Sequence, residues 1–277
     1  MWEETGLVTF SLSTGSAFLL QTMEPSIAAV VDEHSVFRTD AVGRGVRSIA
    51  SVMTWIYGGP EALAEADRLR AMHARLASVD EHGVRHTALA SRPWAWVLLT
   101  GVHAFVQSAR YFSRRPLTEA EKEAFYQENV QLMRNFAVPE KEIPATYADY
   151  LALFEETVRT HLRPTRVAHD FLAVSRTVPP PPALPAPLRP LWRAAAFVPG
   201  RLQHFVTVGT TPPVARRMLG LEWTGADERR LRILGRVVAH AVPLLPERLR
   251  YFPIAYEGRR LERARQRLRR TLDLRPL

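Results

Sequence analysis

Apolar residues recur at intervals of three and four along most of the chain, which is the period of an amphipathic helix. In residues 44–58 this spacing is carried by Ile49, Val52, Met53 and Ile56, and Gly58 with Gly59 ends the segment. Similar segments open at Pro25 and Pro60, where proline takes its favoured first helical position. No stretch shows the sustained alternation of a strand. The pattern therefore predicts an all-α fold.

The segment opening at Pro60 places a histidine among apolar and arginine residues. Leu69, Met72, His73 and Leu76 share one helix face by their spacing, while the neighbouring arginines lie largely elsewhere. We therefore expect His73 to point inward. A lone histidine on an apolar face is either a hydrogen-bonded core residue or a ligand, and the residues of this segment alone do not separate the two.

Three further segments carry clear helix signals. The longest uncharged run, residues 93–109, is short for a membrane span and contains His103, which favours a buried core helix. Thr118 and Glu121 are spaced as a capping box, and Thr146 is placed to cap the next helix.

A proline-rich connector occupies residues 178–190, with the sequence "VPPPPALPAPLRP". It cannot be helical across its prolines. It either separates two domains or lies as a strap over one. We expect a strap, because few helices follow it and they would form a thin core alone. The expected organisation is a single helical-bundle domain over residues 1–277.

Composition narrows the chemistry. The chain has 277 residues, 47% hydrophobic and 23% charged, with a mean hydropathy of −0.13 and no cysteine. The absence of cysteine excludes disulfides, thiolate metal sites, cysteine nucleophiles and covalent haem attachment. We see no secretory signal and no membrane span in the sequence, so we expect a cytoplasmic protein.

The formal net charge of +9 comes almost entirely from arginine, and much of it lies near the end of the chain. Residues 257–275 are predicted to form a basic helix with seven arginines between Arg259 and Arg270. Such a helix is either a solvated face or a surface for an anionic partner. Because the chain lacks interleaved aromatics and any DNA-reading motif, no nucleic-acid partner is expected, whereas peripheral membrane contact stays open.

A second candidate group lies at the start of the helix predicted over residues 44–58. Arg44, Arg47 and Ser48 occupy its first turns, where the helix dipole favours anions rather than cations. The two arginines therefore need a carboxylate or another anion nearby. A ligand would supply it, and so would an ordinary salt bridge with Asp40 or Glu33.

The order of motifs resembles a known family. It begins with "LLQTMEPSIAAVVDEHSVF" at residues 19–37, followed by the R-x-x-[RK]-[ST] helix start at residues 44–48 and "WIYGGPEAL" at residues 55–63. Next come H-x-x-[VL] at residues 73–76 and "HTALASRPWAWVL" at residues 86–98, and the similarity continues past the connector. In this order and spacing they are similar to the haem-dependent oxygenases that include the fungal endoplasmic-reticulum oxygenase of mycophenolic acid biosynthesis and the catalytic domain of rubber oxygenase.

The resemblance implies a helical domain with a globin-like core and a non-covalent haem b. In that arrangement His73 is the proximal iron ligand, and Arg44 with Ser48 lies on the distal side. Arg47 stands where rubber oxygenase has a lysine, and arginine is a very poor iron ligand, which implies an open or water-occupied sixth position. His103 is held as a backup ligand, and is expected more strongly as a core histidine.

The resemblance also implies an activity, and the chain departs from the family pattern at three positions. Glu24 and Leu98 stand where histidines are common in the family, and the glycine that follows the family's "Vaa" is absent. The implied reaction is oxygenation, or oxidative C=C cleavage, of an apolar isoprenoid or lipid-like substrate with O2. The alternatives are a non-catalytic haem- or lipid-binding helical protein and a basic interaction protein without a cofactor.

Overall fold

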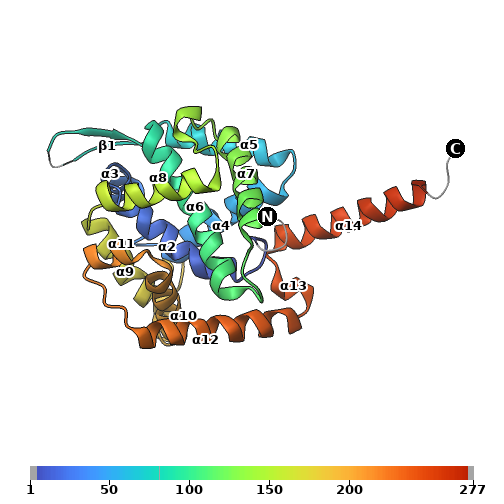
Figure 1. Ribbon diagram of the computed structural model, residues 1–277. Coiled ribbons are helices and arrows are strands. Elements are labelled where there is room, and N and C mark those ends of the chain that lie inside the picture. The colour runs from blue at the N-terminus through green and yellow to red at the C-terminus, as the bar shows by residue number, and fades with distance from the viewer. Residues whose placement is uncertain (1–4, 81, 274–277) are drawn as a thin grey trace.

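The computed structural model describes residues 5–80 and 82–273, and helices account for most of them (Figure 1). The helices before the proline-rich connector are α2 Phe10–Thr22, α3 Pro25–His34, α4 Ala41–Tyr57, α5 Glu61–His73, α6 Ser91–Phe112, α7 Glu119–Asn135, α8 Tyr147–Thr160 and α9 Arg166–Thr177. Those after it are α10 Arg189–Thr210, α11 Pro213–Met218, α12 Gly225–Ala241, α13 Glu247–Arg250 and α14 Pro253–Asp273. Three short 3-10 turns complete the helical structure: η1 Glu140–Glu142, η2 Ala186–Leu188 and η3 Val242–Leu244. The predicted all-α class is confirmed.

The helix starts follow the local signals. The capping box of Thr118 with Glu121 opens α7, and Thr146 caps α8 by accepting a hydrogen bond from the amide of Asp149. Both predictions are confirmed. In each case a threonine oxygen satisfies an amide that the first helical turn leaves without a partner.

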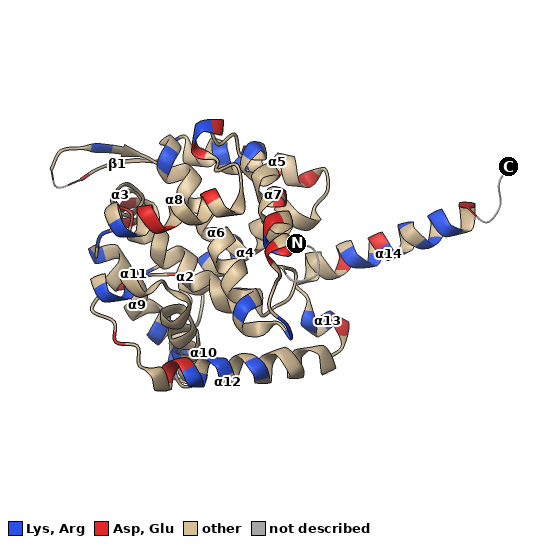
Figure 2. Ribbon diagram, viewed as in Figure 1, with Lys and Arg blue, Asp and Glu red and all other residues tan. Residues whose placement is uncertain are grey.

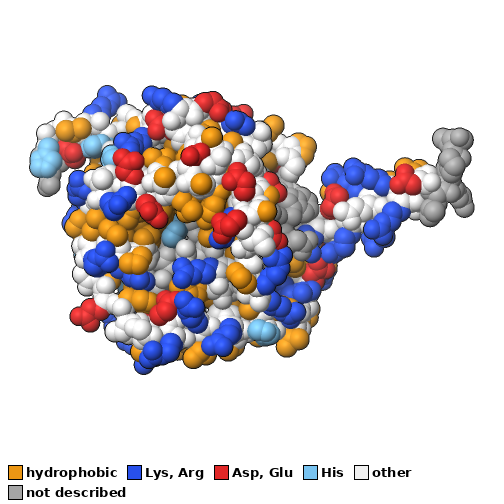
Figure 3. All heavy atoms as spheres, in the orientation of Figure 1, with side chains coloured by type: hydrophobic (Ala, Val, Ile, Leu, Met, Phe, Trp, Pro, Cys, Tyr) orange, Lys and Arg blue, Asp and Glu red, His pale blue; other side chains and the backbone are white. Residues whose placement is uncertain are grey.

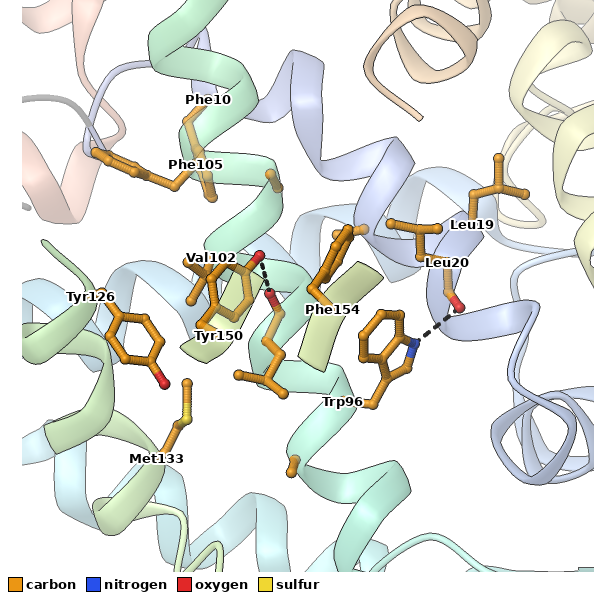
Figure 4. Packing of buried hydrophobic residues seen from close by; sticks show 14 of the residues in the cluster. Phe10, Leu19, Leu20, Trp96, Val102, Phe105, Tyr126, Met133, Tyr150 and Phe154 are labelled. Carbon is orange, nitrogen blue, oxygen red and sulfur yellow. Dashed lines mark hydrogen bonds between the residues drawn. The ribbon is translucent and has the colours of Figure 1, made fainter. Parts of the chain in front are cut away.

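Helix α6 is the centre of the core. It packs along α2, and α10 packs against α2 as well. Trp96, Val102 and Phe105 of α6 are buried, and Figure 4 shows them among the rings of Tyr150 and Phe154. The buried core helix predicted for residues 93–109 is therefore confirmed. Among the described residues, no helix is both long enough and apolar enough to cross a lipid bilayer.

A two-stranded hairpin was not predicted. The helix expected to run on past His73 ends at that residue, and β1 Ala77–Val79 pairs antiparallel with β2 Arg85–Thr87. Asp80 forms the turn, because its Oδ1 accepts hydrogen bonds from the amides of His82 and Val84, both 2.9 Å long, and Gly83 has a φ of +78°. Strands of three residues are too short to show an alternating pattern.

The proline-rich connector joins α9 to α10, and these two helices pack against each other. The chain leaves α9 through Val178, whose φ of +43° is in the left-handed region, and the indole N–H of Trp192 donates a 2.9 Å hydrogen bond to the Val178 carbonyl. The non-helical segment ends at residue 185, because the 3-10 turn η2 begins at Ala186 and α10 begins at Arg189. The prediction of a connector without helix up to residue 190 is therefore wrong at its end, where Pro187 and Pro190 take the early helical positions that proline tolerates. The elements on the two sides of the connector are thus in direct contact.

The predicted basic helix at the end of the chain is α14, which projects away from the body (Figure 1). It starts at Pro253, earlier than the expected start at residue 257, because proline again takes the first helical position. It is described as far as Asp273, and residues 274 and 275 of the prediction lie outside the described part of the chain.

Candidate functional site

His73 is the last residue of α5, and its ring is half-buried against Trp94 of α6, with 5.1 Å between the ring centroids. Its Nδ1 lies 2.7 Å from the carbonyl oxygen of Leu69. A carbonyl only accepts hydrogen bonds, so Nδ1 carries the proton. Burial lowers the pKa of His73 below its ordinary value, which keeps the ring neutral. Its Nε2 then has a lone pair that no hydrogen bond within the described residues uses.

The helix face predicted around His73 is only partly correct. His73 turns toward the body as expected, but Met72 is 42% exposed. Leu76 lies beyond the end of α5, so helical spacing no longer places it on the same face. The early end of the helix explains both differences.

Trp55 of α4 lies in the same aromatic group as His73. The ring of Phe136 contacts Trp55 at 4.6 Å and Trp94 at 6.1 Å between centroids. The Nε1 of Trp55 is buried and has no hydrogen-bond partner in the described structure. A buried donor without a partner costs roughly 1–3 kcal/mol, so this N–H is a place where an oxygen of a ligand would be favourable. Nothing in the sequence pattern had singled out Trp55.

Arg44 lies in the fourth position of α4, and its guanidinium covers the ring of Phe18 at 3.6 Å from the centroid. Phe18 belongs to a second aromatic group, in which Phe171 and Phe37 contact it at 4.8 and 5.8 Å. Burial, with a smaller effect from the nearby charge of Arg47, lowers the pKa of Arg44 to about 10. The side chain therefore stays charged at neutral pH, yet no carboxylate among the described residues pairs with it.

Arg47 and Ser48 are more exposed. Both terminal nitrogens of Arg47 lie 3.2 Å from Oδ2 of Asp40, whose Oδ1 caps α4 by accepting from the amide of Gly43. The salt bridge with Asp40 foreseen from the sequence therefore exists at Arg47 and not at Arg44. Ser48 is exposed on the same helix.

His103 is a buried residue of α6. Its Nε2 donates a 2.8 Å hydrogen bond to the carbonyl of Thr210, and its ring stacks on Phe154 at 4.9 Å. Burial lowers its pKa to about 4, so the ring is neutral. This is the environment expected of a core histidine, and the nitrogen that a ligand role would most readily use is engaged.

The candidate residues lie on two packed helices but in two aromatic groups. Helices α4 and α5 are in contact, and Ser51 donates a 2.6 Å hydrogen bond to Glu65 between them. Within the described residues, His73 and Arg44 contact different aromatic rings, Trp94 and Phe18. The structure thus gives a neutral imidazole and an unpaired guanidinium on neighbouring helices.

The two residues that replace the family's histidines, Glu24 and Leu98, have structural roles. Glu24 caps α3, where its Oε2 accepts a 2.7 Å hydrogen bond from the amide of Ile27, and it also lines a cavity of about 40 Å³ next to Trp96 and His161. That volume is enough for a water molecule or two. Leu98 is half-buried against the core.

Comparisons with known proteins give the family. Residues 2–240 match the family described as ER-bound oxygenase mpaB/B'/rubber oxygenase, catalytic domain. The chain belongs to this family, and the match indicates an oxygenase-type catalytic domain. The resemblance inferred from the order of motifs is therefore confirmed.

Two curated relatives are similar to this chain, one from Mycobacterium tuberculosis and one from Mycobacterium bovis, and both are named as uncharacterised proteins. Each is 30% identical over 176 residues, which is 64% of this chain and 64% of the relative. The matched segment thus spans less than two thirds of their length. No solved structure matches the chain.

Proposed function

We propose that this protein is a haem b-dependent oxygenase that acts with O2 on an apolar, isoprenoid or lipid-like substrate. The observation that carries the proposal is the state of His73. Its proton is held on Nδ1 by the carbonyl of Leu69, its pKa is lowered, and the lone pair of Nε2 is free. This is the tautomer that a histidine ligand requires, with its other nitrogen fixed by a backbone acceptor.

The remaining residues fit the polar periphery of a haem. The guanidinium of Arg44 has no anionic partner among the described residues, and a propionate is a carboxylate that would supply one. The unpartnered N–H of Trp55, in the aromatic group around His73, is a further donor for an oxygen of the bound group. Haem, when bound, supplies the activation of dioxygen. The chain would supply the ligand nitrogen, a fixed positive charge and apolar walls.

The first experiment is the ultraviolet-visible spectrum of protein produced with haem supplementation, compared with a His73→Ala variant. His240→Ala is the matched control, because Nδ1 of His240 makes the same 2.7 Å hydrogen bond to the carbonyl four residues earlier, but on an exposed helix end. We expect a Soret band near ~400 nm, as is usual for haem b, in the wild type and in His240→Ala, and its loss or shift in His73→Ala. A band that survives in His73→Ala and disappears in His103→Ala would move the ligand to His103. No band in any protein would refute haem binding.

A second experiment tests Arg44. Replacing Arg44 by methionine keeps length and removes the charge, and we expect the affinity for haem to fall by about tenfold or more, as for loss of a charged hydrogen bond. Arg201→Met is the control, because Arg201 covers Phe197 at 4.4 Å on an exposed surface. Equal affinities in both variants would remove Arg44 from the proposed site.

Catalysis is tested separately by O2 consumption with an isoprenoid polymer or a long terpenoid, using the haem-loaded wild type with a reductant. Substrate-dependent uptake that is lost in His73→Ala supports an oxygenase. Haem binding without any uptake on such substrates would instead support a non-catalytic haem-binding protein.

A further inference from the structure

The start of α14 is fixed to the body of the protein. Ala255 is completely buried, Gly258 faces Tyr57 of α4, and Arg259 and Arg263 both pair with Glu247 of α13. The first turns are therefore held in place by packing and by ion pairs. The rest of the helix extends outward (Figure 1).

The outer part of α14 carries an apolar stripe. Ile254, Leu261, Leu268 and Leu272 follow one another at intervals of seven, seven and four residues, which places them within roughly 40° around the helix axis. They are 39%, 52%, 60% and 64% exposed. Ala255, which points into the body, lies about 100° away from Ile254. The stripe is thus a continuous apolar face that becomes more exposed toward the end of the helix.

Arginines lie beside this stripe and on the polar face behind it. Arg265 and Arg269 lie along one edge, Arg267 lies about 100° beyond the other edge, and Arg270 lies on the opposite face. All four are exposed, and none has an acidic partner among the described residues. Figure 2 shows the row of basic residues along the projecting helix, and Figure 3 shows that its side chains stand clear of the body.

We propose that α14 docks on an anionic lipid surface. The apolar stripe would enter the boundary between headgroups and acyl chains, and the flanking arginines would meet lipid phosphates while their aliphatic stems cover apolar surface. The helix has the features of an interfacial helix, which are an apolar face, a strongly basic polar face and low overall hydrophobicity. Its high charge fits a position along the membrane plane.

The charge and the apolar stripe of α14 argue against two other partners for this face, a second copy of the chain and a nucleic acid. The helix has seven arginines and three acidic residues, Glu257, Glu262 and Asp273, so pairing with a second copy would bring like charges together. A nucleic acid would satisfy the arginines but would leave the leucines of the stripe exposed to water. An anionic bilayer satisfies both the charge and the apolar stripe.

The test is sedimentation of the full-length protein with vesicles, which does not depend on haem or on activity. Vesicles of phosphatidylcholine with phosphatidylglycerol at roughly 30% are compared with phosphatidylcholine alone, at low and high salt. We expect binding to the anionic vesicles only, and weaker binding at high salt.

Two variants test the two halves of the surface, and a third is the matched control. The first variant changes four arginines to glutamine: Arg265, Arg267, Arg269 and Arg270. The second variant changes three leucines of the stripe to serine: Leu261, Leu268 and Leu272. The control changes four exposed arginines on other elements to glutamine and so removes the same charge: Arg85, Arg159, Arg217 and Arg229.

Both α14 variants should lose about tenfold or more in vesicle binding, and the control should stay within about threefold of the wild type. Circular dichroism checks that each variant is folded. Vesicle binding that the control loses as strongly as the arginine variant would overturn the proposal, as would binding that the leucine variant retains. The proposal would also be overturned if the wild-type protein did not bind anionic vesicles and instead bound duplex DNA, or if light scattering showed that it forms dimers through α14.

Discussion

Gly235 allows α12 to cross α6 at close range, and replacing it by alanine should destabilise the protein. The glycine is buried, and a Cβ added there would overlap the carbonyl oxygen of Tyr111 and lie 3.0 Å from its carbonyl carbon. Carbon atoms pack at about 3.5–4 Å, so α12 would have to retreat by about half an ångström or more. That shift would disturb Leu231, which is fully buried, and the hydrogen bond from Tyr111 to Glu228, 3.1 Å long.

Two opposing effects set the change in the free energy of unfolding that Gly235→Ala should cause. Overpacking typically costs about 1–3 kcal/mol, and the upper part of that range, about 2–3 kcal/mol, applies here because the added Cβ meets a backbone carbonyl rather than a flexible side chain. Replacing glycine by alanine inside a helix gains about 1 kcal/mol. We therefore expect Gly235→Ala to lower the free energy of unfolding by about 1–2 kcal/mol. Gly101→Ala is the control, because Gly101 lies inside α6 and nothing stands within 4 Å of an added Cβ. That variant should gain up to about 1 kcal/mol.

The assay is urea unfolding followed by circular dichroism, with the midpoints of both variants measured beside the wild type. The two variants should move in opposite directions. A Gly235→Ala protein as stable as the wild type, or two variants that shift alike, would show that close helix contact does not determine stability at this crossing.

Three further changes test other features. Burial lowers the pKa of His103 to about 4, so the unfolded chain takes up a proton before the folded protein does as the pH falls. The free energy of unfolding should therefore drop by about 2 kcal/mol between pH 7.5 and 5 because of this group. Urea titrations at the two pH values should show this loss in the wild type and not in His103→Gln. Burial alone would raise the pKa of Asp32, but hydrogen bonds from Arg38 and Arg166, each 2.6 Å long, outweigh burial and lower the pKa. Asp32→Asn should therefore lower the free energy of unfolding by about 0.5–1 kcal/mol near pH 7, and by little once the pH falls below the folded-state pKa of Asp32. An equal loss at both pH values would contradict this. Trp55→Phe removes a buried donor that has no partner in the described structure, but it also removes part of the indole that packs on Phe136. The two effects oppose each other, so the melting temperature of the haem-free protein should change by a few degrees at most, and a drop of about ten degrees in a thermal melt would contradict this.

Features encoded by neighbouring residues could be predicted from the sequence. A few adjacent positions determine each of these features, which are the helix caps at Thr118 and Thr146, the helix end at Gly58 and the buried helix α6. The hairpin formed by residues 77–79 and 85–87 was missed, because three paired residues on each strand are too few to show an alternating pattern.

Only part of the candidate site could be predicted from the sequence. His73 could be found because a histidine on an apolar helix face stands out, and the family motifs then gave it a role. Whether Arg44 or Arg47 pairs with Asp40 depends on side-chain reach across a helix start, which spacing does not resolve. The unpartnered N–H of Trp55 is a property of three-dimensional packing, because it depends on which atoms surround the ring.

The guanidinium of Arg44, which has no carboxylate partner among residues 5–80 and 82–273, links the stability of the protein to the binding of anions. A charge that the fold leaves without a counter-ion makes the empty protein less stable than its core alone would allow. Any anionic compound that reaches Arg44 relieves this cost, so occupancy and thermal stability rise together. At a ligand concentration of about one hundred times Kd, the gain is about 2.7 kcal/mol. A thermal-shift screen of carboxylates and tetrapyrroles would therefore report directly on whether an anion binds at Arg44.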